Sequence, residues 1–226
     1  MSKNVKMLFT RHILVGAIGG VYVWLFWMSR PEWSWEMRLW RSFGDASLML
    51  LFMTLAIGPL SRLWTTATQL LIYRRQTGIW FAILALIHSF LIWNGWARWD
   101  FSRFLGFEFI PQLNRVARLE PGFGLSNLIG MVALLLTVVL LVTSSECAMK
   151  RLGSSWKWLH YSAYTIFYLS ALHTGYYLFI HFSISFHKNP APPNWFRIPF
   201  LILVAILLII KLLAFVKTVS RRKKNV

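Results

Sequence analysis

The sequence is poor in charged residues and in residues that form covalent cross-links. Its 226 residues include only seven acidic side chains and a single cysteine, Cys147. A lone cysteine excludes an intrachain disulfide and every metal motif that needs paired cysteines. Charged residues make up 14% of the chain, whereas soluble domains contain about 25%. This composition excludes an ordinary soluble domain and directs attention to the long apolar runs.

Apolar residues make up 57% of the chain and gather in long runs. Because about 20 apolar residues cross a bilayer, we expect an all-α membrane protein: one domain, residues 1–226, forming a bundle of about six transmembrane helices. We interpret the basic N-terminal residues as leading into an uncleaved first helix rather than a signal peptide. The expected spans are Ile13–Met28, Ala46–Leu60, Thr77–Trp96, Leu125–Thr143, Trp156–Phe182 and Ile198–Val216.

The formal net charge of +17 comes mostly from residues between or beyond the apolar runs. This distribution favours the positive-inside rule over nucleic-acid binding. With six spans, more lysines and arginines fall on the side that bears both termini, so we expect both termini, including a basic tail over residues 217–226, to be cytoplasmic. Asp45 borders the opposite side. We expect a multi-pass protein of a bacterial inner membrane, with lipid as one partner and no nucleic-acid partner.

Two histidines are expected to lie deep in the membrane, where ionisable groups are costly and usually functional. His88 follows Leu86-Ile87, and His173 follows Ala171-Leu172. At 1.5 Å per residue, His88 lies ~16 Å along its span and His173 ~25 Å along its own. Histidines at comparable depth on different helices can hold one haem iron from its two faces.

His160 is a third candidate, nearer the cytoplasmic end of the span that carries His173. The thirteen intervening residues correspond to ~20 Å of helix, which suits a second haem, although the two side chains would then face different neighbours. The expected partner position on the third span holds Arg74 and Arg75. Arginine is not a haem-iron ligand, but it can pair with a haem propionate. His12 is an alternative second ligand.

Other interpretations of the histidines remain open at this point. Membrane histidines also form hydrogen bonds between helices, which would suit a structural subunit of a larger complex, and they serve as proton relays in transporters. The central parts of the spans lack Asp and Glu, which argues against a transporter. We expect His181 and His187 to lie at the membrane interface.

Four segments carry a resemblance to a known family. They are Leu55–Arg62, Leu70–Trp80, Leu86–His88 and the block from Thr143 to His173. Over about residues 43–182 the chain resembles the ferric reductase-like transmembrane domain. Within that family it is most similar to the MsrQ-type haem-binding membrane subunit of periplasmic methionine sulfoxide reductase systems.

The resemblance implies a membrane cytochrome b. His88, His160 and His173 match the haem-associated positions. The resemblance therefore implies one haem b held by His88 and His173, and a second haem that involves His160. It also implies that Arg74 and Arg75 lie near a haem. It implies no catalytic side chain in the chain itself, which would act as the electron-transfer component of an oxidoreductase.

The resemblance also suggests partners. We expect no flavin or nicotinamide domain in this chain, because no Gly-rich dinucleotide motif is present. Bound FMN stays open as a cofactor, although no segment predicts a site for it. Electrons would come from quinol or from a separate cytoplasmic flavin reductase. They would pass to a periplasmic, molybdenum-containing methionine sulfoxide reductase. The alternatives are a transmembrane reductase of ferric iron or another acceptor, and a non-redox structural or transport subunit.

Overall fold

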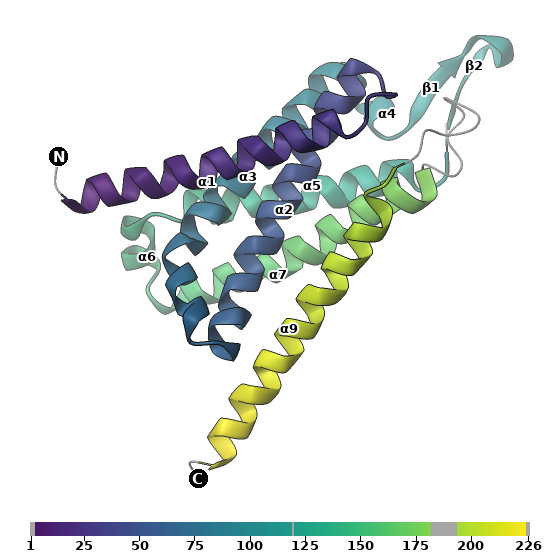
Figure 1. Ribbon diagram of the computed structural model, residues 1–226. Coiled ribbons are helices and arrows are strands. Elements are labelled where there is room, and N and C mark those ends of the chain that lie inside the picture. Colours follow the sequence, from purple (N-terminus) through teal and green to yellow (C-terminus); the bar gives the residue numbers. More distant parts are fainter. Residues whose placement is uncertain (1–2, 119, 182–193, 225–226) are drawn as a thin grey trace.

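The computed structural model describes residues 3–118, 120–181 and 194–224, and it is almost entirely helical (Figure 1). In chain order the elements are α1 (Lys3–Met28), α2 (Trp35–Leu63), the 3₁₀ helix η1 (Thr66–Tyr73), α3 (Arg74–Leu91), the π-helix η2 (Ile92–Ala97), α4 (Phe101–Phe104), β1 (Phe107–Ile110), η3 (Pro111–Leu113), β2 (Arg115–Arg118), α5 (Phe123–Val142), α6 (Glu146–Leu152), α7 (Ser154–Gly175), the π-helix η4 (Tyr176–His181) and α9 (Arg197–Lys224).

Five of the described segments are long and apolar enough to cross a membrane. They comprise α1, α2, η1 with α3 and η2, α5 and α9. The expected span from Trp156 forms α7 and η4, and its polar side chains, such as Lys157 and His160, lower its mean hydropathy. Its predicted end at Phe182 lies outside the described residues, as does His187. The prediction of an all-α membrane protein is confirmed.

The second span begins eleven residues earlier than predicted, at Trp35 instead of Ala46. The Ser34 side chain caps its first turn by accepting a hydrogen bond from the backbone N–H of Met37, a role for which serine is well suited. Asp45 therefore lies within α2, ten residues after its first residue, and it is buried in an ion pair with Arg30 at 2.6 Å. At the other end of the chain, the part of the predicted basic tail that the structure describes, residues 217–224, is helical and continues α9.

The bundle contains two helix pairs. Helix α2 packs closely on α3, and α5 packs closely on α7, whereas contacts between the two pairs are fewer. Helices α1 and α9 pack on α2. Buried apolar side chains from both pairs, including Leu50, Leu55, Ile166 and Phe167, form the core. We call the boundary between the α2–α3 pair and the α5–α7 pair the seam.

The two ends of the bundle differ. At one end, which we call the hairpin end, β1 and β2 form an antiparallel hairpin with Phe107 opposite Arg118 and Ile110 opposite Arg115. At the other, the α6 end, the short helix α6 joins α5 to α7. Figure 1 shows the hairpin and α6 at opposite sides of the molecule.

Candidate functional site

A cavity of about 350 Å³ lies along the seam, lined by side chains from α2, α3, α5 and α7. This volume falls within the range of small-molecule sites, about 300–1,000 Å³. Its walls are mostly apolar, with Leu48, Phe81 and Leu134 among the lining residues. His88 of α3 and His173 of α7 also line it, so the fold brings the two deepest predicted histidines to one cavity.

The ring of His88 is held in one orientation by α2. Its Nδ1 lies 2.8 Å from the carbonyl oxygen of Trp40. Because a carbonyl oxygen can only accept, Nδ1 must carry the proton and Nε2 keeps its lone pair. One turn further along α2, a Cβ on Gly44 would lie 3.0 Å from the ring. The glycine therefore gives the imidazole room to approach the backbone.

His173 is held in the same way by α5. Its Nδ1 lies 2.8 Å from the carbonyl oxygen of Ser126, and a Cβ on Gly130 would lie 2.8 Å from that nitrogen. Both sites thus combine an accepting carbonyl at one residue with a glycine four residues later. The result is two neutral imidazoles from different helices in one apolar cavity, and neither Nε2 forms a hydrogen bond with the residues that the structure describes. Such a donor pair suits the two axial positions of a planar metal cofactor.

Polar groups form the rim of the cavity towards the hairpin end. The guanidinium of Arg41 lies 4.7 Å from the centre of the Tyr177 ring, and the Tyr177 hydroxyl donates to Oδ1 of Asn127 at 2.5 Å. Nδ1 of His181 lies 2.7 Å from Oε1 of the buried Glu120. His181 therefore contributes to the rim, at the end of the span on which it was predicted to lie at the interface.

Sequence reasoning missed Arg41. It lies one turn before Gly44 on the same helix, between the first two predicted spans, Ile13–Met28 and Ala46–Leu60. No carboxylate in the described part of the chain lies within ion-pairing distance of Arg41, since Asp45 pairs with Arg30 instead. Arg41 thus offers a positive charge to the cavity.

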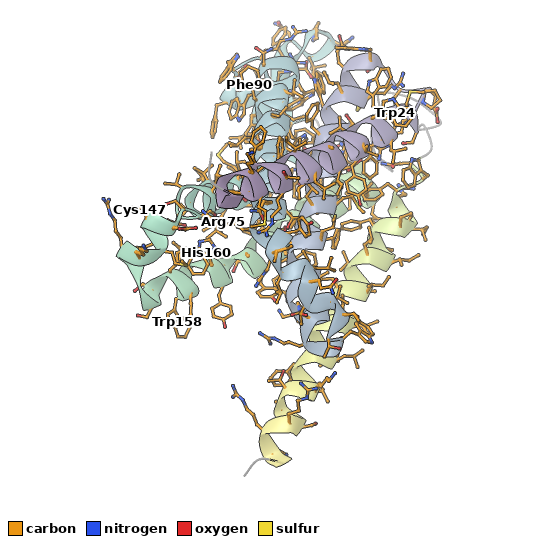
Figure 2. The ribbon with its side chains drawn as sticks, turned by 60° about the vertical axis from the view of Figure 1, so that its left-hand side comes forward. Trp24, Arg75, Phe90, Cys147, Trp158 and His160 are labelled. Atoms are coloured by element: carbon orange, nitrogen blue, oxygen red, sulfur yellow. The ribbon has the colours of Figure 1, made fainter. Side chains whose placement is uncertain are left out.

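His160 lies away from this cavity, at the α6 end. Its Nε2 is 3.3 Å from the hydroxyl of Thr143, and its ring stacks on Trp156 with centres 4.0 Å apart. Figure 2 shows His160 on the same side of the molecule as Cys147 and Trp158, away from Phe90. His12, on α1, does not line the cavity either.

The two neighbouring arginines of α3 point in different directions. The guanidinium carbon of Arg74 would lie 3.6 Å from a Cβ on Gly58 of α2. Arg75 instead forms an exposed ion pair with Glu146 at 3.7 Å. Neither arginine lines the cavity. Among the described residues, no group of three or more His, Cys, Asp and Glu side chains is arranged to hold a metal ion directly.

Comparison with known proteins adds a family to this geometry. Residues 43–171 match the family described as "Ferric reductase like transmembrane component". The chain is 36% identical over 135 residues to the "Protein-methionine-sulfoxide reductase heme-binding subunit MsrQ" of Bordetella pertussis. The aligned region covers 60% of this chain and 59% of the relative. A protein of the same name from Herminiimonas arsenicoxydans is 33% identical over 138 residues, 59% of this chain and 55% of the relative.

The match to these curated relatives thus spans less than two thirds of their length. Together with the five apolar helices, the comparisons confirm the predicted location in a bacterial inner membrane as a multi-pass protein. The match to the family extends over more than half of the sequence and contains His88 and His160, with His173 just beyond its end. The chain therefore belongs to the ferric reductase-like transmembrane family.

Proposed function

We propose that the chain binds haem b between His88 and His173 and carries electrons across the membrane. The observation that supports this most strongly is the pair of hydrogen bonds from Nδ1 to the Trp40 and Ser126 carbonyls. These bonds leave the lone pair of each Nε2 available to bind a metal, and haem iron accepts such axial ligands. A haem bound there would supply a one-electron Fe(III)/Fe(II) couple.

The side chains around the cavity would orient the cofactor and tune its potential. The Nδ1–H bonds fix the tautomer of each histidine and increase the basicity of Nε2. The apolar walls exclude water, and burial is one of the properties that set a haem potential. Arg41 has no carboxylate partner within the described residues, so it would pair with a propionate, as arginine does with planar carboxylates.

A second haem is part of the proposal at the α6 end. It would use His160, for which the resemblance implies a haem-associated role, and Arg74, whose charge acts on His160 through space, could pair with a propionate together with its neighbour Arg75. The hydroxyl of Thr143 lies near Nε2 of His160, so ligation there would require this contact to open. The support for the second haem is therefore weaker than for the first.

The names of the MsrQ relatives support a place in a methionine sulfoxide reductase system. With both termini cytoplasmic, as the charge distribution favours, electrons would enter from quinol or a flavin reductase at the α6 end. They would leave at the hairpin end, to a periplasmic methionine sulfoxide reductase.

A reduced-minus-oxidised visible spectrum of the detergent-purified protein, with haem quantified as pyridine haemochrome, tests the proposal. We expect sharp b-type bands in the wild type and their loss in His88→Ala and His173→Ala. His160→Ala tests the second haem, and His12→Ala tests the alternative second ligand for it. A colourless wild type, purified after haem-supplemented expression, would overturn the proposal and favour a structural or transport role.

A further inference from the structure

An aromatic wall closes the cavity beyond His88. Helix α3 continues as the π-helix η2, and its Trp93 lines the cavity together with Phe104 of α4. The rings of Trp93 and Phe104 stack at 4.6 Å with an interplanar angle of 10°. Here the π-helix is the last turn of the helix that begins as α3, and π-helical turns are uncommon and frequently occur at functional sites.

Two further aromatic rings extend this wall to the surface. Trp99 stacks on Trp93 at 6.1 Å, and Phe101 stacks on Trp93 at 6.3 Å. Trp99 is 65% exposed and Phe101 is 54% exposed. We call Trp93, Trp99, Phe101 and Phe104 the aromatic exit, because they form a continuous set of packed rings from the cavity wall to the outside of the protein.

The backbone is strained where the exit reaches the surface. Arg98 and Trp99 have φ angles of 52° and 60°, and a left-handed non-glycine residue costs about 1–3 kcal/mol. The N–H of Trp99 donates to the carbonyl of Trp93 at 3.1 Å, which folds the indole back over the stack. Asp100 then caps α4 by accepting from the N–H groups of Ser102 and Arg103. Such strain concentrates at functional sites.

Residues 97–120, which carry the exit and the adjoining hairpin, leave a surplus of positive charge at this end of the molecule. The three acidic residues of this segment are occupied: Asp100 caps α4, Glu108 pairs with Arg103 at 3.6 Å and Glu120 binds His181. Three arginines of residues 97–120 are exposed and form no ion pair within the described residues: Arg98, Arg115 and Arg118. A surface with exposed aromatic rings and free arginines has the composition of a protein interface.

We propose that the aromatic exit is the docking surface for a soluble redox protein that carries an acidic patch around its electron-accepting centre. The inference rests on the function proposed above. In each transfer one electron leaves the reduced protein and reduces the acceptor by one electron, with no proton moved. Arg98, Arg115 and Arg118 attract the partner, and Trp99 and Phe101 form the contact.

Two soluble acceptor proteins of opposite charge provide the test: acidic plastocyanin and basic cytochrome c, each mixed in a stopped-flow instrument with the dithionite-reduced, haem-loaded protein. At low ionic strength we expect plastocyanin to oxidise the protein at least about tenfold faster, because complementary charge raises association rates by 10–10³. High salt should abolish this preference. The triple variant Arg98→Gln, Arg115→Gln, Arg118→Gln should also lose it.

The aromatic contact has its own variants. Trp99→Asn removes the indole but tolerates the positive φ, and Phe101→Ala removes the second exposed ring. Each should slow oxidation by plastocyanin with haem content and midpoint potential unchanged. Trp158→Ala is the matched control, because Trp158 is 77% exposed but lies at the α6 end, and it should leave the rate unchanged.

Equal rates for the two acceptors, or faster oxidation by cytochrome c, would overturn the charge assignment. Wild-type rates in both Trp99→Asn and Phe101→Ala would overturn the docking surface. These results differ from failure of the proposed function, in which the wild type shows no haem spectrum and no rate can be measured.

Discussion

The two ends of the bundle place histidines in very different surroundings. At the seam, His88 and His173 each have a backbone carbonyl at 2.8 Å from Nδ1 and a glycine that makes room for the ring. At the α6 end, His160 contacts a hydroxyl through Nε2 and stacks on Trp156 outside the cavity. The seam site has its donor atoms free and its rings fixed, whereas the α6 end offers a histidine whose Nε2 is already in contact.

A histidine at a suitable position is therefore not the same as a histidine whose ring is already oriented to bind a metal. The resemblance to the family implies a haem-associated role for all three histidines, but only His88 and His173 have an Nδ1 hydrogen bond to a backbone carbonyl, which selects one tautomer. The surrounding charge differs too: Asp45 and Arg30 are buried near the seam, whereas Arg75 and Glu146 form an exposed pair. Variants can test each contrast.

The largest change in free energy is expected from Asp45→Ala, which should destabilise the fold. Arg30 already has two buried nitrogens, Nε and Nη1, without hydrogen-bond partners, and Asp45 is its carboxylate partner. Removing one partner of a buried pair costs about 3–5 kcal/mol. We expect this loss in the free energy of unfolding, measured by chemical denaturation in detergent. A loss below about 1 kcal/mol would show that water reaches the pair.

Gly130→Ala should weaken haem binding by about 10–100-fold, the usual cost of disturbing a group that supports a metal ligand. The added Cβ would lie 2.8 Å from Nδ1 of His173 and would push the ring away from the Ser126 carbonyl. Haem retention is measured by titration of the apoprotein with haemin. Gly20→Ala is the control, because no atom lies within 4 Å of its added Cβ. Equal affinities in both variants would contradict the proposed geometry.

Arg41→Ala should weaken haem retention by about tenfold, the smaller end of the range for a charge-assisted hydrogen bond. It should also lower the midpoint potential, since removing a nearby positive charge disfavours the reduced state. Spectroelectrochemical titration measures the potential. Arg38→Ala is the control on the same helix, because Arg38 stacks on Trp27 and donates to its carbonyl. Identical behaviour of the two variants would argue against a propionate at Arg41.

The smallest effect is expected from Glu146→Gln at the α6 end. The ion pair of Glu146 with Arg75 is exposed, and such pairs contribute about 0–1 kcal/mol. The same denaturation measurement used for Asp45→Ala should register little change. A loss as large as that of Asp45→Ala would mean that the α6 end is better shielded from solvent than its exposed side chains suggest.

The sequence predicted the helical membrane fold, because long apolar runs have few other outcomes. It also singled out His88 and His173, since each histidine interrupts an apolar run. It could not predict their orientation, because the accepting carbonyls belong to other helices and a glycine in a membrane helix usually indicates close helix packing. The start of α2, which contains Arg41 and Asp45, was predicted too late for a different reason. Charges and tryptophans break the apolar pattern of α2, so the cap at Ser34 was overlooked.

The repeated arrangement of carbonyl and glycine has a consequence for biogenesis. Each histidine is oriented by the helix it pairs with nearby in the sequence, α2 for His88 and α5 for His173. Each half of the site can therefore mature as soon as its own two helices have been inserted, before the other half is synthesised. Binding of the cofactor would then be the late step, because it would join two helix pairs that have already formed and that have few direct contacts with each other.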